Sequence, residues 1–417
     1  MTFPDDGFFH ALQQDSDDTL RLVFADFLEE RGDDASIARA ELIRVQVELQ
    51  RWSPLYPRFA TLTDRQNELI ETWERVWLGK WTKVLTGWSF RRGLVEAVCA
   101  DASDFLEYAD EWFAEWPTLS VVKLTRASGH LPELAASPWL AHLHGLDLSD
   151  NDINDESLVY LTTSRYIPLL QALDLSDNPI GLRGASLLID AVYADELREL
   201  HLSGCGLGGA GLRRLLDGRG RQWRRLDLSR TGIEAKDMLP FADSPVLRNL
   251  TALDLSWNEL GADGIETLVN SPNVAGLVDL GLSHTKAGNA AVTSLAKSKC
   301  LSNLRSLDLR WHSCTPRYDH EQIDWGGIGE LGRSPMLGQL RRLLLTGDSK
   351  NTDWIADVMS VARPVRELTV SKDWWMTQEL RKSKYLMPSQ FIECDLEDIW
   401  WLGDRFNRDR PPCPWGF

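Results

Sequence analysis

The stretch LHGLDLSDNDI, residues 143–153, recurs along the chain in recognisable form. Its copies are LQALDLSDNPI at Leu170, LRELHLSGCGL at Leu197, WRRLDLSRTGI at Trp223, LTALDLSWNEL at Leu250, LVDLGLSHTKA at Leu277 and LRSLDLRWHSC at Leu304. Successive starts lie 27, 27, 26, 27, 27 and 27 residues apart, and two looser copies begin at Leu340 (LRRLLLTGDSK) and Val365 (VRELTVSKDWW). Self-similarity at a fixed period of this length is the signature of repeat proteins, so we predict a solenoid in which each unit stacks on the next.

Each unit reads as a short strand followed by a helix. Residues of LxxLxL alternate between two faces, so Leu146 and Leu148 are predicted to point into a core and Asp147 away from it. The run Val121–Leu124 is predicted to be the strand of a degenerate first repeat. Apolar residues then recur about every three or four positions, as in 155–161, 183–191, 210–216 and 263–269, which indicates helix. The sequence therefore predicts an α/β fold with parallel strands and helices stacked in repeats.

One position in each unit is suited to holding the turn after the strand. It lies two residues beyond the serine of the motif and is occupied by Asn151, Asn178, Cys205, Thr231, Asn258, Thr285 and His312. An asparagine there is predicted to hydrogen-bond the backbone groups that are freed where the strand turns away.

Strand-plus-helix repeats of about this length resemble the ribonuclease-inhibitor type of leucine-rich repeat. The resemblance covers roughly residues 119–372. It implies a curved solenoid with the parallel sheet on its concave face and helices on its convex face. Proteins of that kind usually bind other proteins through the concave face.

The N-terminal residues read as amphipathic helices. Asp18 or Thr19 can cap the first, which Gly32 is placed to end, and further helices are predicted over about 37–52 and 59–77. The text DTLRLVFADFLEERGD, then AELIRVQVELQRW, resembles the repeat-companion domain that precedes leucine-rich repeats in some bacteria, and weaker resemblance continues through 90–95 and 101–119. The family has no assigned reaction, so the match implies a capping domain and a bacterial origin.

The C-terminal segment is rich in aromatic residues and ends in a proline-rich run, PPCPWGF. We predict that 391–402 covers the last repeat; the final run either packs on the solenoid or serves as a linear motif for a partner. The predicted domains are a helical companion domain (1–92), the leucine-rich-repeat solenoid (93–372) and an aromatic-rich C-terminal cap and tail (373–417).

Composition narrows the class of protein. The chain has 417 residues, 43% of them hydrophobic, and a net charge of −17, which argues against non-specific nucleic-acid binding. It has no apolar run of the roughly 20 residues that span a membrane and no secretory signal pattern, so a cytoplasmic location is expected. The six cysteines form no CxxC pair and are expected to be reduced thiols.

Two columns of outward-pointing residues carry the functional candidates. The first holds Asp147, Asp174, His201, Asp227, Asp254, Gly281 and Asp308, and is predicted to be a solvated structural face. The second, which follows each serine and varies from unit to unit, holds Asp150, Asp177, Gly204, Arg230, Trp257, His284 and Trp311. Exposed Trp257 and Trp311 would be costly on a sheet without a partner, unless neighbouring loops pack on them, and Trp and Arg are favoured anchors of protein interfaces.

The second column, with parts of the first and a long loop at about 313–325, therefore gives the predicted protein-binding residues. They are Asp150, Asp177, Arg230, Asp254, Trp257, His284, Asp308, Trp311 and Tyr318. The partner is expected to be another protein, for example a protease or other effector that the chain regulates.

Three other functions have weaker patterns. The locally basic residues 197–231 could bind nucleic acid or another anionic ligand, and the N-terminal carboxylates could act as an acid–base site. His312, Cys314, Tyr318 and His320 could gather a metal, but a fourth ligand is not evident. No phosphate-binding loop or nucleophile turn accompanies the glycines and serines. The prediction is a non-catalytic binding protein without cofactor or metal.

Overall fold

The fold was analysed in a computed structural model of the chain. It describes residues 18–52, 56–217 and 222–310, and beyond these residues 323, 327, 330–331, 333–334, 339–345, 367–370 and 391–392. The predicted contacts Trp311 and Tyr318, the loop 313–325 apart from residue 323, and most of the predicted C-terminal cap lie outside the described residues. The described residues form two compact units: those up to 148 together with 165–169, and residues 149–164 together with those from 170 onward. The predicted division at residues 92 and 372 stays a prediction.

The first unit begins with a helical layer, as predicted. Helix α2 spans Asp18–Glu30, α3 spans Asp34–Leu49 and α4 spans Pro57–Leu78, followed by the 3-10 turn η1 at Gly79–Lys83. Phe24 and Leu28 of α2 are buried against Ile43 of α3. Asp33 is the N-cap of α3, and its carboxylate accepts a hydrogen bond of 2.9 Å from the Ser36 amide.

A β-hairpin follows that the sequence analysis did not predict. Strand β1 (Gly87–Arg91) pairs antiparallel with β2 (Leu94–Asp101). Strand β2 then pairs parallel with β3 (Val121–Thr125), which is the predicted strand of the degenerate first repeat. Strand β4 (Gly145–Asp147) pairs parallel with β3. Helices α5 (Ala102–Glu115) and α6 (Leu131–Ala136) and the 3-10 turns η2 (Ser128–His130) and η3 (Pro138–His142) connect these strands.

The tip of the hairpin is seated tightly on α3. Arg92 and Gly93 both have positive φ, 49° and 75°, as a two-residue hairpin turn requires. The Gly93 carbonyl accepts a hydrogen bond of 2.6 Å from Arg39 Nε, and its amide donates one of 2.5 Å to Gln46 Oε1. A Cβ at Gly93 would lie 2.2 Å from Cγ1 and 2.9 Å from Cα of Ile43. Only glycine allows this approach.

We therefore expect Gly93→Ala to destabilise the first unit by about 2–3 kcal/mol, through a left-handed backbone cost and overpacking against Ile43. Gly79→Ala is the matched control, because Gly79 also has positive φ (55°) but a Cβ at this position would have no atom within 4 Å. It should cost only about 1 kcal/mol. Urea unfolding followed by circular dichroism measures both, and equal losses would show that the contact with Ile43 contributes nothing.

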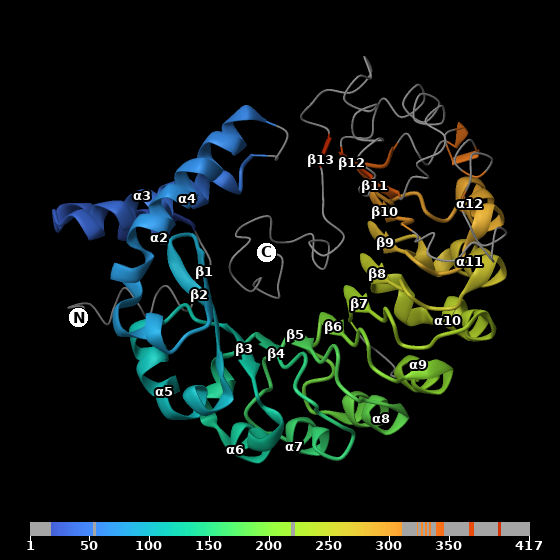
Figure 1. Ribbon diagram of the computed structural model, residues 1–417, viewed down its shortest axis with the longest axis horizontal. Coiled ribbons are helices and arrows are strands. Elements are labelled where there is room, and N and C mark those ends of the chain that lie inside the picture. Colours follow the sequence, from blue (N-terminus) through green and yellow to red (C-terminus); the bar gives the residue numbers. More distant parts are fainter. Residues whose placement is uncertain are drawn as a thin grey trace. The chain divides into compact units, whose positions relative to one another are not determined.

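The second unit is built from stacked strand-and-helix repeats. Its strands, each parallel to the next, are β5 (Ala172–Asp174), β6 (Glu199–His201), β7 (Arg225–Asp227), β8 (Ala252–Asp254), β9 (Asp279–Gly281), β10 (Ser306–Asp308), β11 (Arg342–Leu345), β12 (Glu367–Val370) and β13 (Phe391–Ile392). Its helices are α7 (Leu158–Thr162), α8 (Leu182–Asp190), α9 (Gly208–Leu216), α10 (Met238–Asp243), α11 (Gly261–Val269) and α12 (Gly288–Lys297), with 3-10 turns at Ala235–Asp237, Pro245–Asn249 and Pro272–Val274. Within this unit the strands line one side and helices α8–α12 the other (Figure 1).

The core lies between these two layers. The paired leucines of each strand, such as Leu253 and Leu255 of β8, are at most 2% exposed. At roughly 1.5–3 kcal/mol for each buried leucine, stacked repeats offset the entropy of ordering a unit that could not fold alone. The predicted orientation of the leucines is confirmed.

The predicted asparagine role is confirmed as well. Asn258 is 1% exposed, and its Oδ1 accepts hydrogen bonds from the amides of Thr231 (3.2 Å) and Ile233 (3.0 Å). Its Nδ2 donates to the carbonyls of Leu228 (2.8 Å) and Leu255 (2.9 Å). One side chain therefore ties the turn of its own repeat to the repeat before it.

Candidate functional site

The second predicted column is a ladder of left-handed residues. Backbone φ is 54° at Asp150, 56° at Asp177, 54° at Arg230, 62° at Trp257 and 56° at His284. The amide at each rung donates to the carbonyl of the residue before the next rung, for example Asp177 to Ser203 (2.7 Å) and Trp257 to Ser283 (2.8 Å). The left-handed turn thus continues the sheet hydrogen bonding by one residue. It also projects side chains at the edge of the strands, where bulky residues in this conformation are uncommon.

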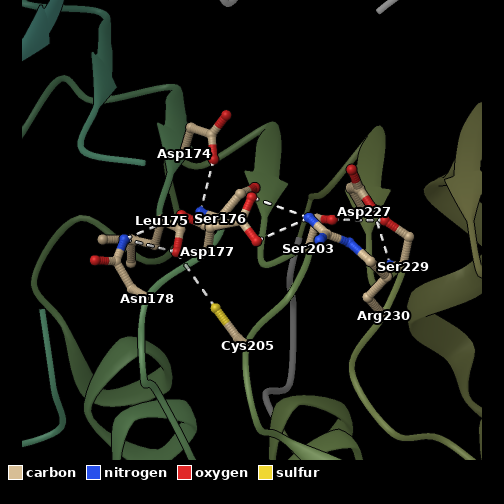
Figure 2. A network of polar contacts seen from close by, with 10 residues as sticks. All are labelled: Asp174, Leu175, Ser176, Asp177, Asn178, Ser203, Cys205, Asp227, Ser229 and Arg230. Atoms are coloured by element: carbon tan, nitrogen blue, oxygen red, sulfur yellow. Dashed lines mark hydrogen bonds and ion pairs between the residues drawn. The ribbon is translucent and has the colours of Figure 1, made fainter. Parts of the chain in front are cut away.

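An ion pair crosses two rungs of this ladder (Figure 2). Arg230 Nη2 lies 2.8 Å from Oδ1 and 2.9 Å from Oδ2 of Asp177. The rung between them is Gly204, where a Cβ would lie 2.2 Å from Asp177 Oδ1. The carboxylate therefore occupies the space that a side chain at Gly204 would need. The structure brings together Asp177 and Arg230, two of the predicted residues, and adds Gly204 to them.

An aromatic stack occupies the next two rungs. The rings of Trp257 and His284 are 3.8 Å apart at their centroids and 19° from parallel, while 49% of Trp257 remains exposed. Trp257 is among the most exposed large hydrophobic residues of the described chain, as predicted. Asp150, at the start of the ladder, is exposed. Trp311 and Tyr318, the remaining members of the predicted set in this region, lie outside the described residues.

The first column differs from its prediction. We expected a solvated face, but Asp147 is 0%, Asp174 6% and His201 2% exposed. Neighbouring side chains cover them: Lys123 Nζ, for example, lies 3.0 Å from Asp147 Oδ2. The column still has a structural role, because its carboxylates accept hydrogen bonds from the amides two residues later, as Asp254 does from Ser256 (2.8 Å).

His201 lies between two carboxylates in the middle of this column. Its Nδ1 lies 4.0 Å from Asp227 Oδ2 and its Nε2 4.0 Å from Glu199 Oε2, distances of Coulombic attraction rather than short hydrogen bonds. Burial alone would lower the pKa of His201, but the carboxylates of Asp227 and Glu199 raise it to about 10. The imidazolium therefore offsets part of the negative charge of the face at neutral pH.

Asp254 has no such counterion within the described residues. Burial and the neighbouring carboxylate of Asp227 raise its pKa to about 7, and Asp308 adds to the effect. Asp308, by contrast, pairs with the guanidinium of Arg310. The predicted residues Asp254 and Asp308 thus lie on the same sheet face but in different electrostatic environments.

The other candidate patterns resolve into structural contacts. In the basic stretch, arginines pair with carboxylates, as in Arg213–Asp237 (2.9 Å) and Arg225–Glu199 (3.4 Å). In the N-terminal helices Arg44 bridges Asp26 and Glu29, each at 2.7 Å. Over the ranges that the structure describes, no group of three or more His, Cys, Asp or Glu is placed to hold a metal ion. None of the helices in those same ranges has the length and apolar character of a membrane span.

Two functional features were missed by the sequence reasoning. The roles of Gly204 and Gly281 depend on side chains leaning across from the preceding repeat, since a Cβ at Gly281 would lie 2.5 Å from Asp254 Oδ1. The sequence does mark these two positions, because glycine stands there in columns where almost every other repeat has a larger side chain.

A comparison with a family model agrees with the repeat fold. The family model of the leucine-rich repeat matches residues 140–161, 166–188, 197–216 and 246–269. No curated protein sequence matches the chain. Among solved structures, the chain is similar to an internalin from Listeria monocytogenes (17% identity, 69% of this chain and 78% of that chain, TM-score 0.35). It is also similar to a chain in the crystal structure of the Rad7 and Elc1 complex in yeast (13% identity, 89% of this chain and 95% of that chain, TM-score 0.38). The matched repeats and the stacked strand-and-helix units show an α/β fold of the leucine-rich-repeat solenoid type.

Proposed function

We propose that this protein is a non-catalytic scaffold that binds another protein through the strand side of its repeats. The contact surface is centred on the ladder formed by Asp177, Gly204, Arg230, Trp257 and His284, which we call the ladder surface. The finer version of the proposal is a bacterial, cytoplasmic regulatory or sensing subunit for a protease or other effector, with the N-terminal helices as a companion domain. The ribonuclease-inhibitor type of the repeats belongs to the same proposal.

The observation that carries the proposal is the half-exposed Trp257 in a strained backbone conformation. A left-handed conformation costs a non-glycine residue about 1–2 kcal/mol, and the same column holds Gly204, where no such cost arises. Exposing 49% of an indole adds no stability to the fold. Stacking on His284 fixes the ring in place, so that little side-chain entropy would be lost on binding. Such rigid aromatic residues dominate protein interfaces.

Binding of nucleic acid is not favoured by the structure. The basic stretch that motivated it has arginines engaged with carboxylates, including Arg230 with Asp177 and Arg214 with Asp190 (3.4 Å). Phosphate binding would have to break these pairs against a net charge of −17. A low-salt titration with DNA and RNA that showed tight, steeply salt-dependent binding would restore this alternative.

Trp257→Gly tests the proposal by separating binding from folding. We expect the free energy of unfolding to change by less than about 1 kcal/mol, because relief of the left-handed strain offsets the lost packing and the added chain entropy. Partner binding should weaken at least tenfold, as for the removal of an interface hot spot. The control is Leu239→Ala, which removes another exposed apolar side chain (63% exposed) on α10.

The measurement is co-purification of the tagged chain from its native cell, with mass spectrometry of the recovered proteins. Wild type and Leu239→Ala should recover the same partner, and Trp257→Gly should lose it. Recovery of that partner by all three proteins would place binding elsewhere. Failure of the wild type to recover any stable protein partner would count against the scaffold function itself.

A further inference from the structure

The strand face beside the ladder surface has an uncompensated carboxylate. Among Asp227, Asp254 and Asp308, the first lies 4.0 Å from His201 and the last is paired with Arg310. No basic side chain of the described residues lies within ion-pair distance of Asp254. Its carboxylate accepts a hydrogen bond of 2.8 Å from the Ser256 amide through Oδ1. Of these three carboxylates, Asp254 is therefore the one without a cation within ion-pair distance among the described residues.

The same chain shows how such a carboxylate is satisfied elsewhere. Asp177 leans over the glycine of the next rung, Gly204, and meets a guanidinium from the rung beyond it. Figure 2 shows this bridge, with Arg230 extended toward Asp177. The arrangement needs three successive rungs: a carboxylate, a glycine and an arginine.

Asp254 repeats the first two parts of this arrangement without the third. It leans over Gly281, its in-register neighbour on β9, where a Cβ would lie 2.5 Å from Oδ1 and 2.9 Å from Oδ2. In this strand column, the residue that pairs with Gly281 on the next strand, β10, is Asp308 and not an arginine. Burial and the neighbouring carboxylates of Asp227 and Asp308 raise the pKa of Asp254, as expected for a carboxyl group without a nearby cation.

An aromatic surface lies beside this gap. Trp257 follows Asp254 by three residues, so their Cα atoms lie at most about 10 Å apart, and its indole is half exposed. An aromatic face attracts cations, and the planar guanidinium of arginine suits both carboxylates and indole rings. The apolar stem of an arginine can pack on the indole while its head reaches a carboxylate.

We propose that the gap formed by Asp254, Gly281 and Asp308, together with Trp257, binds an arginine side chain carried by a segment of the partner protein. The incoming guanidinium takes the place that Arg230 takes opposite Asp177. The partner is thus a protein that presents arginine on an exposed segment, and it is attracted by the acidic net charge of this chain. This inference rests on the proposed function and adds the chemistry of the partner to it.

The test uses fluorescein-labelled peptides and the full-length chain, with binding measured by fluorescence anisotropy. The probe is a (Gly-Arg)3 peptide, and its control is the same peptide with citrulline, which keeps the shape of arginine without its charge. Wild type should bind the arginine peptide about tenfold more tightly, the ratio expected for one charge-assisted pair. Asp254→Asn should lose most of that preference. Asp263→Asn is the matched variant, since it makes the same exchange of a carboxylate for an amide at an exposed position in the first turn of α11.

Equal affinity for the arginine and citrulline peptides would overturn the inference. Equal weakening by Asp254→Asn and Asp263→Asn would also overturn it, since the attraction would then be a property of net charge alone. These results differ from failure of the proposed function, which is read from native partner capture by Trp257→Gly. If capture depends on Trp257 while the peptides show no preference, the scaffold function stands and only the arginine site is wrong.

Discussion

Replacing Asn258 with alanine is expected to lower the free energy of unfolding by about 3–4 kcal/mol, because it removes the buried hydrogen bonds of this side chain, the four shortest of them worth about 1 kcal/mol each. The loss also leaves the Ile233 amide and the Leu228 carbonyl buried with fewer partners. Both groups belong to the preceding repeat, so the effect spreads beyond the mutated unit. Urea unfolding monitored by circular dichroism gives the size of the loss.

Asn258→Thr separates the two halves of this hydrogen-bonding role. Threonine already occupies the same position at Thr285, where Oγ1 donates to the Leu282 carbonyl at 2.8 Å. The threonine variant should therefore keep one donor contact, lose the acceptor for Thr231 and Ile233, and cost about 1–2 kcal/mol less than alanine. Indistinguishable losses for the two variants would mean that the asparagine acts by packing volume rather than by its hydrogen bonds.

Asparagine and leucine positions were predictable because their environment is set by the repeat itself. The period fixes which leucines face the core, so Leu146 and Leu148 could be assigned before any coordinates, and both are 1% exposed. The strand always turns away at the same place, so the need for an amide at Asn178 or Asn258 follows from the backbone alone. The helical N-terminal layer was predictable for the same reason, from local periodicity and capping.

Features that depend on contacts between different repeats were not predictable in the same way. The alternation of a strand assigns Asp147 to the outer face, but it cannot show that Lys123, on the neighbouring strand, covers its carboxylate. The bridge from Asp177 over Gly204 to Arg230 joins residues 53 positions apart. The hairpin turn at Gly93 is likewise decided by its close approach to Ile43, which leaves no periodic pattern in the sequence.

Asp254→Asn is expected to stabilise the protein at pH 8 and to leave its stability unchanged at pH 4. Burial, the Asp227 carboxylate on β7 and the Asp308 carboxylate on β10 raise the pKa of Asp254 to about 7 from its ordinary 3.8. Between these two values the folded protein holds a proton that the unfolded chain has released, so stability falls as pH rises through this window. Three pKa units correspond to at most about 4 kcal/mol above pH 7, all of which the neutral asparagine should recover. Its Oδ1 can still accept the hydrogen bond from Ser256.

Asp308→Asn provides the opposite expectation on the same face of the sheet. It leaves Arg310 without its carboxylate partner, so we expect it to lower stability at pH 8. Urea unfolding of wild type and both variants at pH 4, 6 and 8 measures the differences. We expect Asp254→Asn to stabilise the protein more at pH 8 than at pH 4 and to lose the preference for the arginine peptide. Together these two results would mean that the Asp254 carboxylate serves binding and lowers the stability of the fold. A pH-independent difference would show instead that Asp254 is ionised in the folded protein as readily as in the unfolded chain, because the face already supplies its counterion.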